Sequence, residues 1–516
     1  MTSIFQKQTV KQASILIAVI TVSSQILGIV REAILASFFG TSAEYDILLI
    51  ALAVPLMAGG IFFLAIPSAG IPYLQRIAGT GLSGGGLFRL PFVRVNSLLI
   101  LSAAAIVFIV LPLFKNILAS SLSVESADRV IYFGRIFCLL IPLRAFEAVF
   151  RSLLHFRHHF LFPAMAILGF NIVIISILLT LFPTLESSAF ILAWISGTAV
   201  QTLLVVIPCW YFYRVRDNQG KSASFNTGGY LQYLGVIVLI ESVSLLIDPF
   251  DRFICGVYLD AGYVSSVHYA NIIYLVPIRV FIHSVATALF PLMAEKVANH
   301  DMQSLARNYH KSVALSILLI VPISVFMLIY RQEIISLLFE RGAFVSESRM
   351  MTSEVLKYYL FGMFFCSVFF IQSKVFYALK AWRILIITRP LTLFVKVIIG
   401  LLLIKTDWAA AIGGGTTAMF MASFVIFEFY LVIKSGLRYS TDDLKLLLKS
   451  VTTVTLVTVV LVACNTVIEY IGGLNSVFSM AISGFAGFGA LAVLNRLFNL
   501  FEINPARIFK SDKSAA

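Results

Sequence analysis

Four ionisable side chains fall within one apolar stretch, residues 239–259 (LIESVSLLIDPFDRFICGVYL): Glu241, Asp248, Asp251 and Arg252. Carboxylates in such a setting can bind H⁺ or Na⁺, and a guanidinium can bind an anion. At about 100° per residue, positions 241, 248 and 252 lie within about 60° of one another on a helix. Charges at membrane depth are costly unless they face a partner or a water-filled cavity. The stripe therefore predicts an inward-facing polar pathway, with Glu241, Asp248 and Asp251 as ion-coupling or gating groups.

A second set of charges lies earlier in the chain. Arg31 and Glu32 stand near the outer half of the first apolar run, and Asp46 opens the second. Arg31 could bind an anionic head group, because a guanidinium fork matches phosphate oxygens. The alternative is a structural charge cluster that steadies the tight turn between two helices.

A further cation for the same anion could come from the eighth run. Arg279 and His283 are four residues apart and share one face of a helix. Arg252 could act with them, although a helix-packing ion pair from Arg252 to Asp248 or Asp251 is the alternative.

The apolar run at 127–150 carries Arg135, Arg144 and Glu147. Long cationic side chains near the ends of membrane helices often extend to the membrane surface, so we interpret these charges mainly in that way.

The elements that position these charges are membrane helices. The chain is 60% hydrophobic and 12% charged, with a mean hydropathy of +0.97. These values exclude an ordinary soluble protein and predict an all-α polytopic membrane protein. We count about 14 apolar runs of the required length of roughly 20 residues, among them 229–257 and 264–294. Pro249 removes a backbone hydrogen bond and predicts an interruption of the helix near Leu245.

The basic residues are unevenly distributed over the loops. With a cytoplasmic N-terminus, the inside loops and tails hold roughly 22 Lys and Arg, against about six outside. An even number of spans then makes both termini cytoplasmic. The net charge of +13 is thus mostly a topology signal, and no nucleic-acid partner is predicted.

An internal repeat organises the spans. The order Arg31, Gly40, Pro55 in the first pair of spans matches the order Arg252, Gly262, Pro277 in the seventh and eighth. A parallel repeat of two six-helix lobes, with two helices left over, is a transporter architecture. The predicted domains are 1–220 and 221–440 for the lobes, 441–500 for two additional transmembrane helices, and 501–516 for a basic cytoplasmic tail.

Enzyme chemistry is not predicted. The sequence contains no Walker A pattern, no Ser/His/Asp grouping and no metal-ligand spacing, and its five cysteines are isolated in apolar runs. We therefore predict no catalytic residues, no metal and no cofactor.

Several segments resemble the MurJ/MviN family of lipid-linked saccharide flippases, within the multidrug/oligosaccharidyl-lipid/polysaccharide exporter superfamily. The resemblance rests on Ser24–Glu32 (SQILGIVRE), on Tyr269–Asn271 (YAN) and on Leu337–Phe344 (LLFERGAF). It implies a cavity lined by spans one, two, seven and eight, with Asn271 among its residues, and two last helices that cradle a lipid tail. The chain departs from the family pattern at cationic positions, where it has Gln25, Ala53, Gly59, Gly60 and Ile272.

The resulting prediction is a flippase that moves a polyprenyl-diphosphate-linked saccharide, such as the lipid II peptidoglycan precursor, across the bacterial cytoplasmic membrane by alternating access. We expect a monomer that contacts membrane lipids and is driven by H⁺, Na⁺ or the membrane potential. One alternative is an exopolysaccharide or O-antigen repeat-unit flippase, which the missing cations favour. Others are an ion-coupled drug exporter, with Glu241 and Asp248 as ion sites, and a non-transporting membrane scaffold, which the intramembrane charges disfavour.

Overall fold

A computed structural model describes residues 10–77, 90–115, 123–157, 159–214, 226–471, 475–498 and 500. The described chain is helical and contains no strand. It divides into two compact units. Unit 1 comprises Met1–Tyr269 with Leu338–Met351, and unit 2 comprises Ala270–Leu337 with Thr352–Ala516. The predicted all-α architecture is confirmed.

The helices of unit 1 follow one another in chain order. They are α1 (Val10–Phe39), α2 (Ala43–Ile77), α3 (Pro91–Val110), the 3-10 turn η3 (Leu111–Phe114), α5 (Val124–Phe137), α6 (Leu140–Phe156), α7 (Leu161–Leu185), α8 (Ser187–Arg214), α9 (Thr227–Leu245) and α10 (Ile247–Tyr258). Helix α11 (Tyr263–Pro277) begins in unit 1 and ends in unit 2.

Unit 2 contains the remaining helices. They are the π-helical turn η4 (Ile278–Ile282), α12 (His283–Ala298), α13 (Met302–Ile329), α14 (Arg331–Phe339), α15 (Ser346–Ala378), α16 (Trp382–Leu403), η5 (Ala410–Gly414), α17 (Gly415–Phe429), η6 (Tyr430–Lys434), α18 (Thr441–Ile471) and α19 (Ser476–Leu497). The last residues of α14 and the first residues of α15 belong to unit 1.

Thirteen helical segments of the described chain are long and apolar enough to cross a membrane. The predicted span at 127–150 is not among them because it is divided into α5 and α6. Pro142 explains the division: it has no N–H for the carbonyl of Cys138, and proline is tolerated in the first turn of the new helix. The thirteen segments and this divided span agree with the prediction of about 14 spans.

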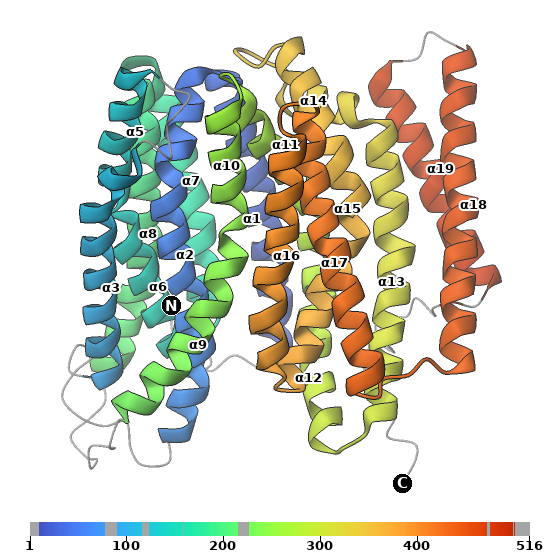
Figure 1. Ribbon diagram of the computed structural model, residues 1–516, viewed down its shortest axis with the longest axis horizontal. Coiled ribbons are helices and arrows are strands. Elements are labelled where there is room, and N and C mark those ends of the chain that lie inside the picture. Colours follow the sequence, from blue (N-terminus) through green and yellow to red (C-terminus); the bar gives the residue numbers. More distant parts are fainter. Residues whose placement is uncertain are drawn as a thin grey trace. The chain divides into compact units, whose positions relative to one another are not determined.

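The charged stretch 239–259 is interrupted where the sequence predicts it. Helix α9 ends at Leu245, Leu246 forms a turn, and α10 begins at Ile247. In Figure 1, α10 continues upward from the upper end of α9. Pro249 lacks the N–H that would bond the Leu245 carbonyl, so the predicted interruption has its expected cause.

Three glycines let loops of unit 1 approach one another closely. Gly40 (φ 54°), Gly262 (φ 97°) and Gly342 (φ 59°) have left-handed backbones, which favour glycine. A Cβ atom at Gly40 would lie 2.2 Å from the Ala343 carbonyl oxygen, and one at Gly342 would lie 2.2 Å from that of Ser37. Residues 338–344 of unit 1 therefore return to the turn between α1 and α2.

The predicted additional helices at 441–500 correspond to α18 and α19, which run side by side (Figure 1). The predicted tail at 501–516 lies outside the described residues. The predicted lobes 1–220 and 221–440 stay a prediction; α9 and α10 cluster with the helices that precede them in unit 1.

Candidate functional site

The side chains of Arg31 and Glu32 form a cluster in unit 1 with residues of α7 and α11. Arg31 Nε donates to Glu32 Oε1 at 3.1 Å, and Arg31 Nη1 donates to Asn171 Oδ1 at 3.0 Å. His268 Nε2 lies 3.3 Å from the other carboxylate oxygen of Glu32. Glu32 is buried, with 2% of its surface exposed. The carboxylate thus joins α1 to α11, and the guanidinium joins α1 to α7.

Aromatic rings complete the surroundings of Arg31. Its guanidinium carbon lies 5.2 Å from the ring centroid of Trp194 and 5.5 Å from that of Phe170. A cation near aromatic faces is stabilised by the ring quadrupoles. Asn171 and Trp194 were not singled out from the sequence, although a lone Asn within the apolar run of α7 was a usable signal.

Asp46 is the acceptor for the start of α11. Its carboxylate oxygens accept the backbone N–H of Gly262 at 2.6 Å and that of Ser265 at 2.8 Å. The first N–H groups of a helix have no partner within the helix, so this carboxylate stabilises the N-terminus of α11 from a neighbouring helix. Asp46 is buried. This contact explains the position of Asp46 opposite the Gly262 loop.

Arg252 holds α10 against α2. It forms an ion pair with Asp248 at 2.9 Å and donates from Nη1 to the Leu49 carbonyl oxygen. Arg252 and Asp251 are buried, whereas the side chain of Asp248 is 41% exposed. The helix-packing ion pair considered from the sequence is therefore present, with Asp248 as the partner.

Three other predicted residues lie on α9, α11 and η4. Glu241 is partly buried on α9 in unit 1. Asn271 is partly buried on α11, and Arg279 is exposed on η4; both belong to unit 2. The roles of all the predicted site residues in substrate binding or ion coupling stay predictions.

A second charged cluster in unit 1 joins α6 to α2. Arg151 forms an ion pair with Glu147 at 3.3 Å and donates from Nη2 to the Phe63 carbonyl oxygen at 3.1 Å. Pro67 has no N–H for that carbonyl, so Arg151 satisfies an acceptor that the proline leaves free. Arg144, two turns earlier on α6, has its guanidinium carbon 5.0 Å from the ring centroid of Phe63.

Unit 2 contains a polar network that the sequence did not reveal. The Glu428 carboxylate accepts hydrogen bonds from the hydroxyls of Tyr309 and Tyr439 and from Gln372 Nε2. His310 stacks on Tyr439 with 3.9 Å between the ring centroids. Burial and the nearby Glu428 carboxylate raise the pKa of Tyr439, so its hydroxyl remains a donor. The network joins α13, α15 and α17 to Tyr439, which lies just before α18.

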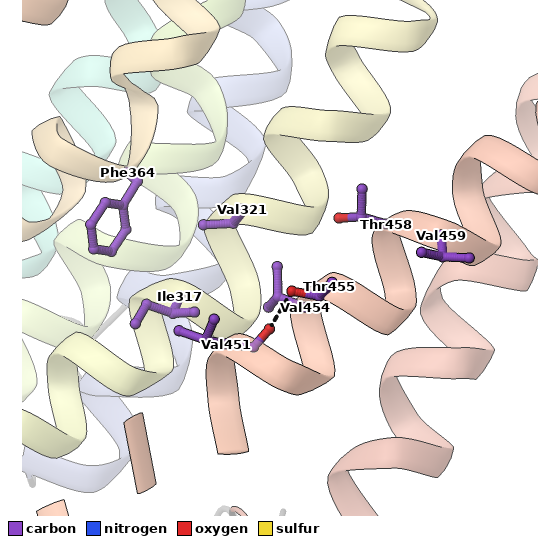
Figure 2. Close-up of a pocket in the computed structure, with 8 residues that line it drawn as sticks. All are labelled: Ile317, Val321, Phe364, Val451, Val454, Thr455, Thr458 and Val459. Atoms are coloured by element: carbon purple, nitrogen blue, oxygen red, sulfur yellow. Dashed lines mark hydrogen bonds between the residues drawn. The ribbon is translucent and has the colours of Figure 1, made fainter. Parts of the chain in front are cut away.

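An apolar groove of about 430 Å³ lies in unit 2 (Figure 2). It is lined by residues of α13, α15 and α18, namely Ile317, Val321, Phe364, Val451, Val454, Thr455, Thr458 and Val459. Thr455 donates its hydroxyl to the Val451 carbonyl of its own helix at 3.0 Å, so the hydroxyl is satisfied within α18. Val451 and Val459 are 50% and 59% exposed, which leaves the groove open at the surface of unit 2.

The small residues of α19 serve close packing instead of lining the groove. A Cβ atom at Gly487 would lie 2.5 Å from Leu461 Cδ2 of α18, and the Ser483 hydroxyl lies 2.6 Å from the Tyr330 hydroxyl. The groove itself is lined by α18 and not by α19.

Among the residues that the structure describes, no group of three or more His, Cys, Asp or Glu side chains could hold a metal ion.

Comparison with known proteins assigns the fold. A solved structure titled "Lipid II flippase MurJ, inward closed conformation" aligns with a TM-score of 0.76 at 20% identity, covering 94% of this chain and 98% of that one. A MATE-family multidrug transporter of the MOP superfamily aligns with a TM-score of 0.62 at 14% identity, covering 82% of this chain and 99% of that one. The predicted all-α membrane fold is thus shared with both of these structures.

Sequence comparison assigns the family. A probable lipid II flippase MurJ from Aquifex aeolicus is 27% identical over 410 residues, which cover 75% of this chain and 76% of the relative. The family model described as "Lipid II flippase MurJ" matches residues 35–485. Since this match spans most of the polypeptide, the resemblance seen in the sequence is confirmed, and the chain belongs to the MurJ family of lipid II flippases.

Proposed function

We propose that this multi-pass membrane protein translocates lipid II, a polyprenyl-diphosphate-linked saccharide, from the cytoplasmic to the outer leaflet of the bacterial cytoplasmic membrane. The observation that carries the proposal is the family match over residues 35–485. A polar head group cannot cross hydrocarbon unaided, because each unsatisfied polar group costs several kcal/mol there. Alternating access through a membrane-embedded cavity removes that cost.

The apolar groove of unit 2 supports a long-chain lipid as the substrate. Its volume of about 430 Å³ lies within the usual range of roughly 300–1,000 Å³ for ligand pockets. Such a groove can hold one part of a polyprenyl chain while the remainder stays in the bilayer. We therefore propose that α18, which lines the groove and lies beyond the predicted six-plus-six repeat, helps to hold the tail.

Filling the groove tests this role. Thr455→Trp places a large ring among the lining residues and should reduce lipid II binding, measured by native mass spectrometry, by about tenfold or more. Thr452→Trp is the matched control, because Thr452 is also exposed on α18 and also bonds the carbonyl four residues earlier, but does not line the groove. Equal binding by the two variants would contradict the tail-groove assignment.

The transport assay tests the function as a whole. Proteoliposomes that contain the chain should move fluorescent lipid II between leaflets, whereas protein-free vesicles should not. Translocation of a cationic drug without translocation of lipid II would instead favour the drug-exporter alternative.

We propose that an H⁺ or Na⁺ gradient or the membrane potential drives the translocation of lipid II. One charge crossing 100 mV gains about 2.3 kcal/mol. Of the predicted coupling groups, Asp251 is buried, Asp248 is held by Arg252, and Glu241 is partly buried. We propose a monomer as the working unit, since the substrate groove is lined within one chain.

Orientation is a separate prediction. Because basic residues concentrate in loops and tails on one side, both termini should be cytoplasmic. Alkaline phosphatase fused at Ala516 should be inactive, and the same reporter inserted next to Glu186, between α7 and α8, should be active. An active fusion at Ala516 would overturn the predicted orientation.

A further inference from the structure

Arg144 occupies space that a glycine on the neighbouring helix leaves open. Its Cδ atom lies 3.4 Å from the position that a Cβ atom would take at Gly59. Its guanidinium carbon lies 5.0 Å from the ring centroid of Phe63, one turn further along α2. A Cβ atom at the adjacent Gly60 would lie 3.4 Å from Cδ1 of Leu245, the last residue of α9. The guanidinium of α6 and the interrupted helix α9–α10 thus meet the same turn of α2.

This position lies deep within the membrane segment. Gly59 is the central residue of the candidate span Ala43–Gln75. A hydrocarbon core about 30 Å thick and centred on this span would end about 15 Å from Gly59 on either side. Arg144 packs against the middle of this span.

Arg144 forms no direct ion pair within the described residues, although it interacts electrostatically with Glu147. Its Nε atom is buried without a hydrogen-bond partner, and its guanidinium forms no hydrogen bond or ion pair there. The nearest carboxylate along α6, Glu147, forms its ion pair with Arg151. Arg151 is satisfied further by the Phe63 carbonyl oxygen. Two arginines thus share one carboxylate, and the cluster retains one positive charge at Arg144.

A cation at this depth requires compensation. Insertion scales assign about 2.5–3.5 kcal/mol to an arginine at the centre of a membrane helix. A cation–π contact offsets about 0.5–2 kcal/mol of this free energy of insertion. The ring of Phe63 therefore leaves much of the charge uncompensated. Part of the Arg144 residue is exposed.

We infer that Arg144 binds the diphosphate of the translocated lipid, with Glu147 and Arg151 as the positioning pair that holds α6 against α2. The inference rests on the proposed function, which supplies a ligand with two phosphate groups. A guanidinium presents its donors in a planar fork that matches phosphate oxygens, and charge-assisted bonds of this type are about twice as strong as neutral ones. The free Arg144 fork would then anchor the head group midway through the membrane.

The test compares ligand binding with the stability of the unliganded protein. Arg144→Met keeps most of the side-chain length and removes the charge. The full chain in nanodiscs should bind lipid II about tenfold or more weakly after this change. Its melting temperature without ligand should be unchanged or higher, because an uncompensated cation is removed. Arg144→Lys should bind between the two, since it keeps the charge and loses the fork.

Arg135→Met is the matched control. Arg135 also lies over an aromatic ring, 5.4 Å from the centroid of Phe108, but it is exposed on α5. It should bind lipid II as the unchanged protein does. Cardiolipin is the second probe, because it carries phosphates without a diphosphate bridge or saccharide, and its binding should be equal in all variants.

The outcomes separate the two proposals. If the unchanged protein binds lipid II no better than cardiolipin, the proposed function fails. If it prefers lipid II and Arg144→Met retains the full affinity, only the role of Arg144 fails. An equal loss of cardiolipin binding would identify a general phospholipid contact, and a lower melting temperature with unchanged affinity would identify a structural arginine; both would overturn the inference.

Discussion

Arg31 and Arg144 are two arginines of unit 1 that each rest near an aromatic ring, at 5.2 Å from Trp194 and 5.0 Å from Phe63. They differ in what their donors reach. Arg31 donates to a carboxylate of its own helix and to Asn171 on α7. Arg144 forms neither kind of contact among the described residues. Both arginines thus lie near an aromatic ring, but only Arg31 has partners for its hydrogen-bond donors.

The difference indicates how to distinguish a structural cation from a binding cation. A guanidinium whose donors are already used can bind a ligand only by breaking contacts that hold helices together. One whose donors are unused gains from an incoming anion without that loss. Arg31 therefore suits the structural cluster that the sequence left as an alternative, and Arg144 suits anion binding.

The largest expected effect is that of Glu32→Ala. It removes the acceptor for two Arg31 donors and the contact with His268, and it leaves a buried charge uncompensated. Removing one partner of a buried ion pair typically costs about 3–5 kcal/mol. We expect a clearly lower melting temperature in detergent and less protein in the membrane. Arg144→Met should show neither effect.

A double change sharpens the same comparison. Arg31→Met with Glu32→Leu removes both charges together, so most of the stability should return. Transport by this folded variant then tests whether Arg31 contacts the diphosphate, as the sequence suggested. A normal melting temperature for Glu32→Ala alone would contradict the structural role of the cluster.

Much of the fold could be predicted because it depends on local signals. Apolar runs of the required length gave the spans, and Pro249 gave the interruption between α9 and α10. Pro142 is an equally local signal for the division of α5 from α6. The close approach of Gly342 to Ser37 depends on segments about 300 residues apart in the chain, and no local pattern encodes it.

The site was less predictable because a charge does not reveal its partners. The sequence placed Asp46 and Arg31 near one turn, and both lie there. It could not reveal that Asp46 accepts N–H groups from α11 or that Asn171 contacts Arg31. Pro67 did carry a signal, since a proline inside a helix leaves the carbonyl four residues earlier without its bond. That carbonyl, of Phe63, is the acceptor for Arg151.

The smallest expected effect comes from Asp46→Asn. The carboxylate accepts one N–H at each oxygen, from Gly262 and from Ser265. An asparagine keeps one oxygen and turns its amide toward the other N–H, which leaves a buried donor unsatisfied. The cost of such a group is about 1–3 kcal/mol. We expect a moderately lower melting temperature and normal membrane insertion.

Asp301→Asn is the matched control, because Asp301 accepts the Ser304 N–H at 3.0 Å at the start of α13 and its side chain is far more exposed than that of Asp46. That hydrogen bond holds the pKa of Asp301 below its usual value. An asparagine there still accepts from Ser304 and leaves no buried donor, so its effect should be smaller than that of Asp46→Asn. If Asp46→Asn instead leaves the melting temperature unchanged and abolishes lipid II transport, Asp46 belongs with Arg144 among the binding residues. Asp46 would then be a binding charge, and Glu32 would remain a structural one.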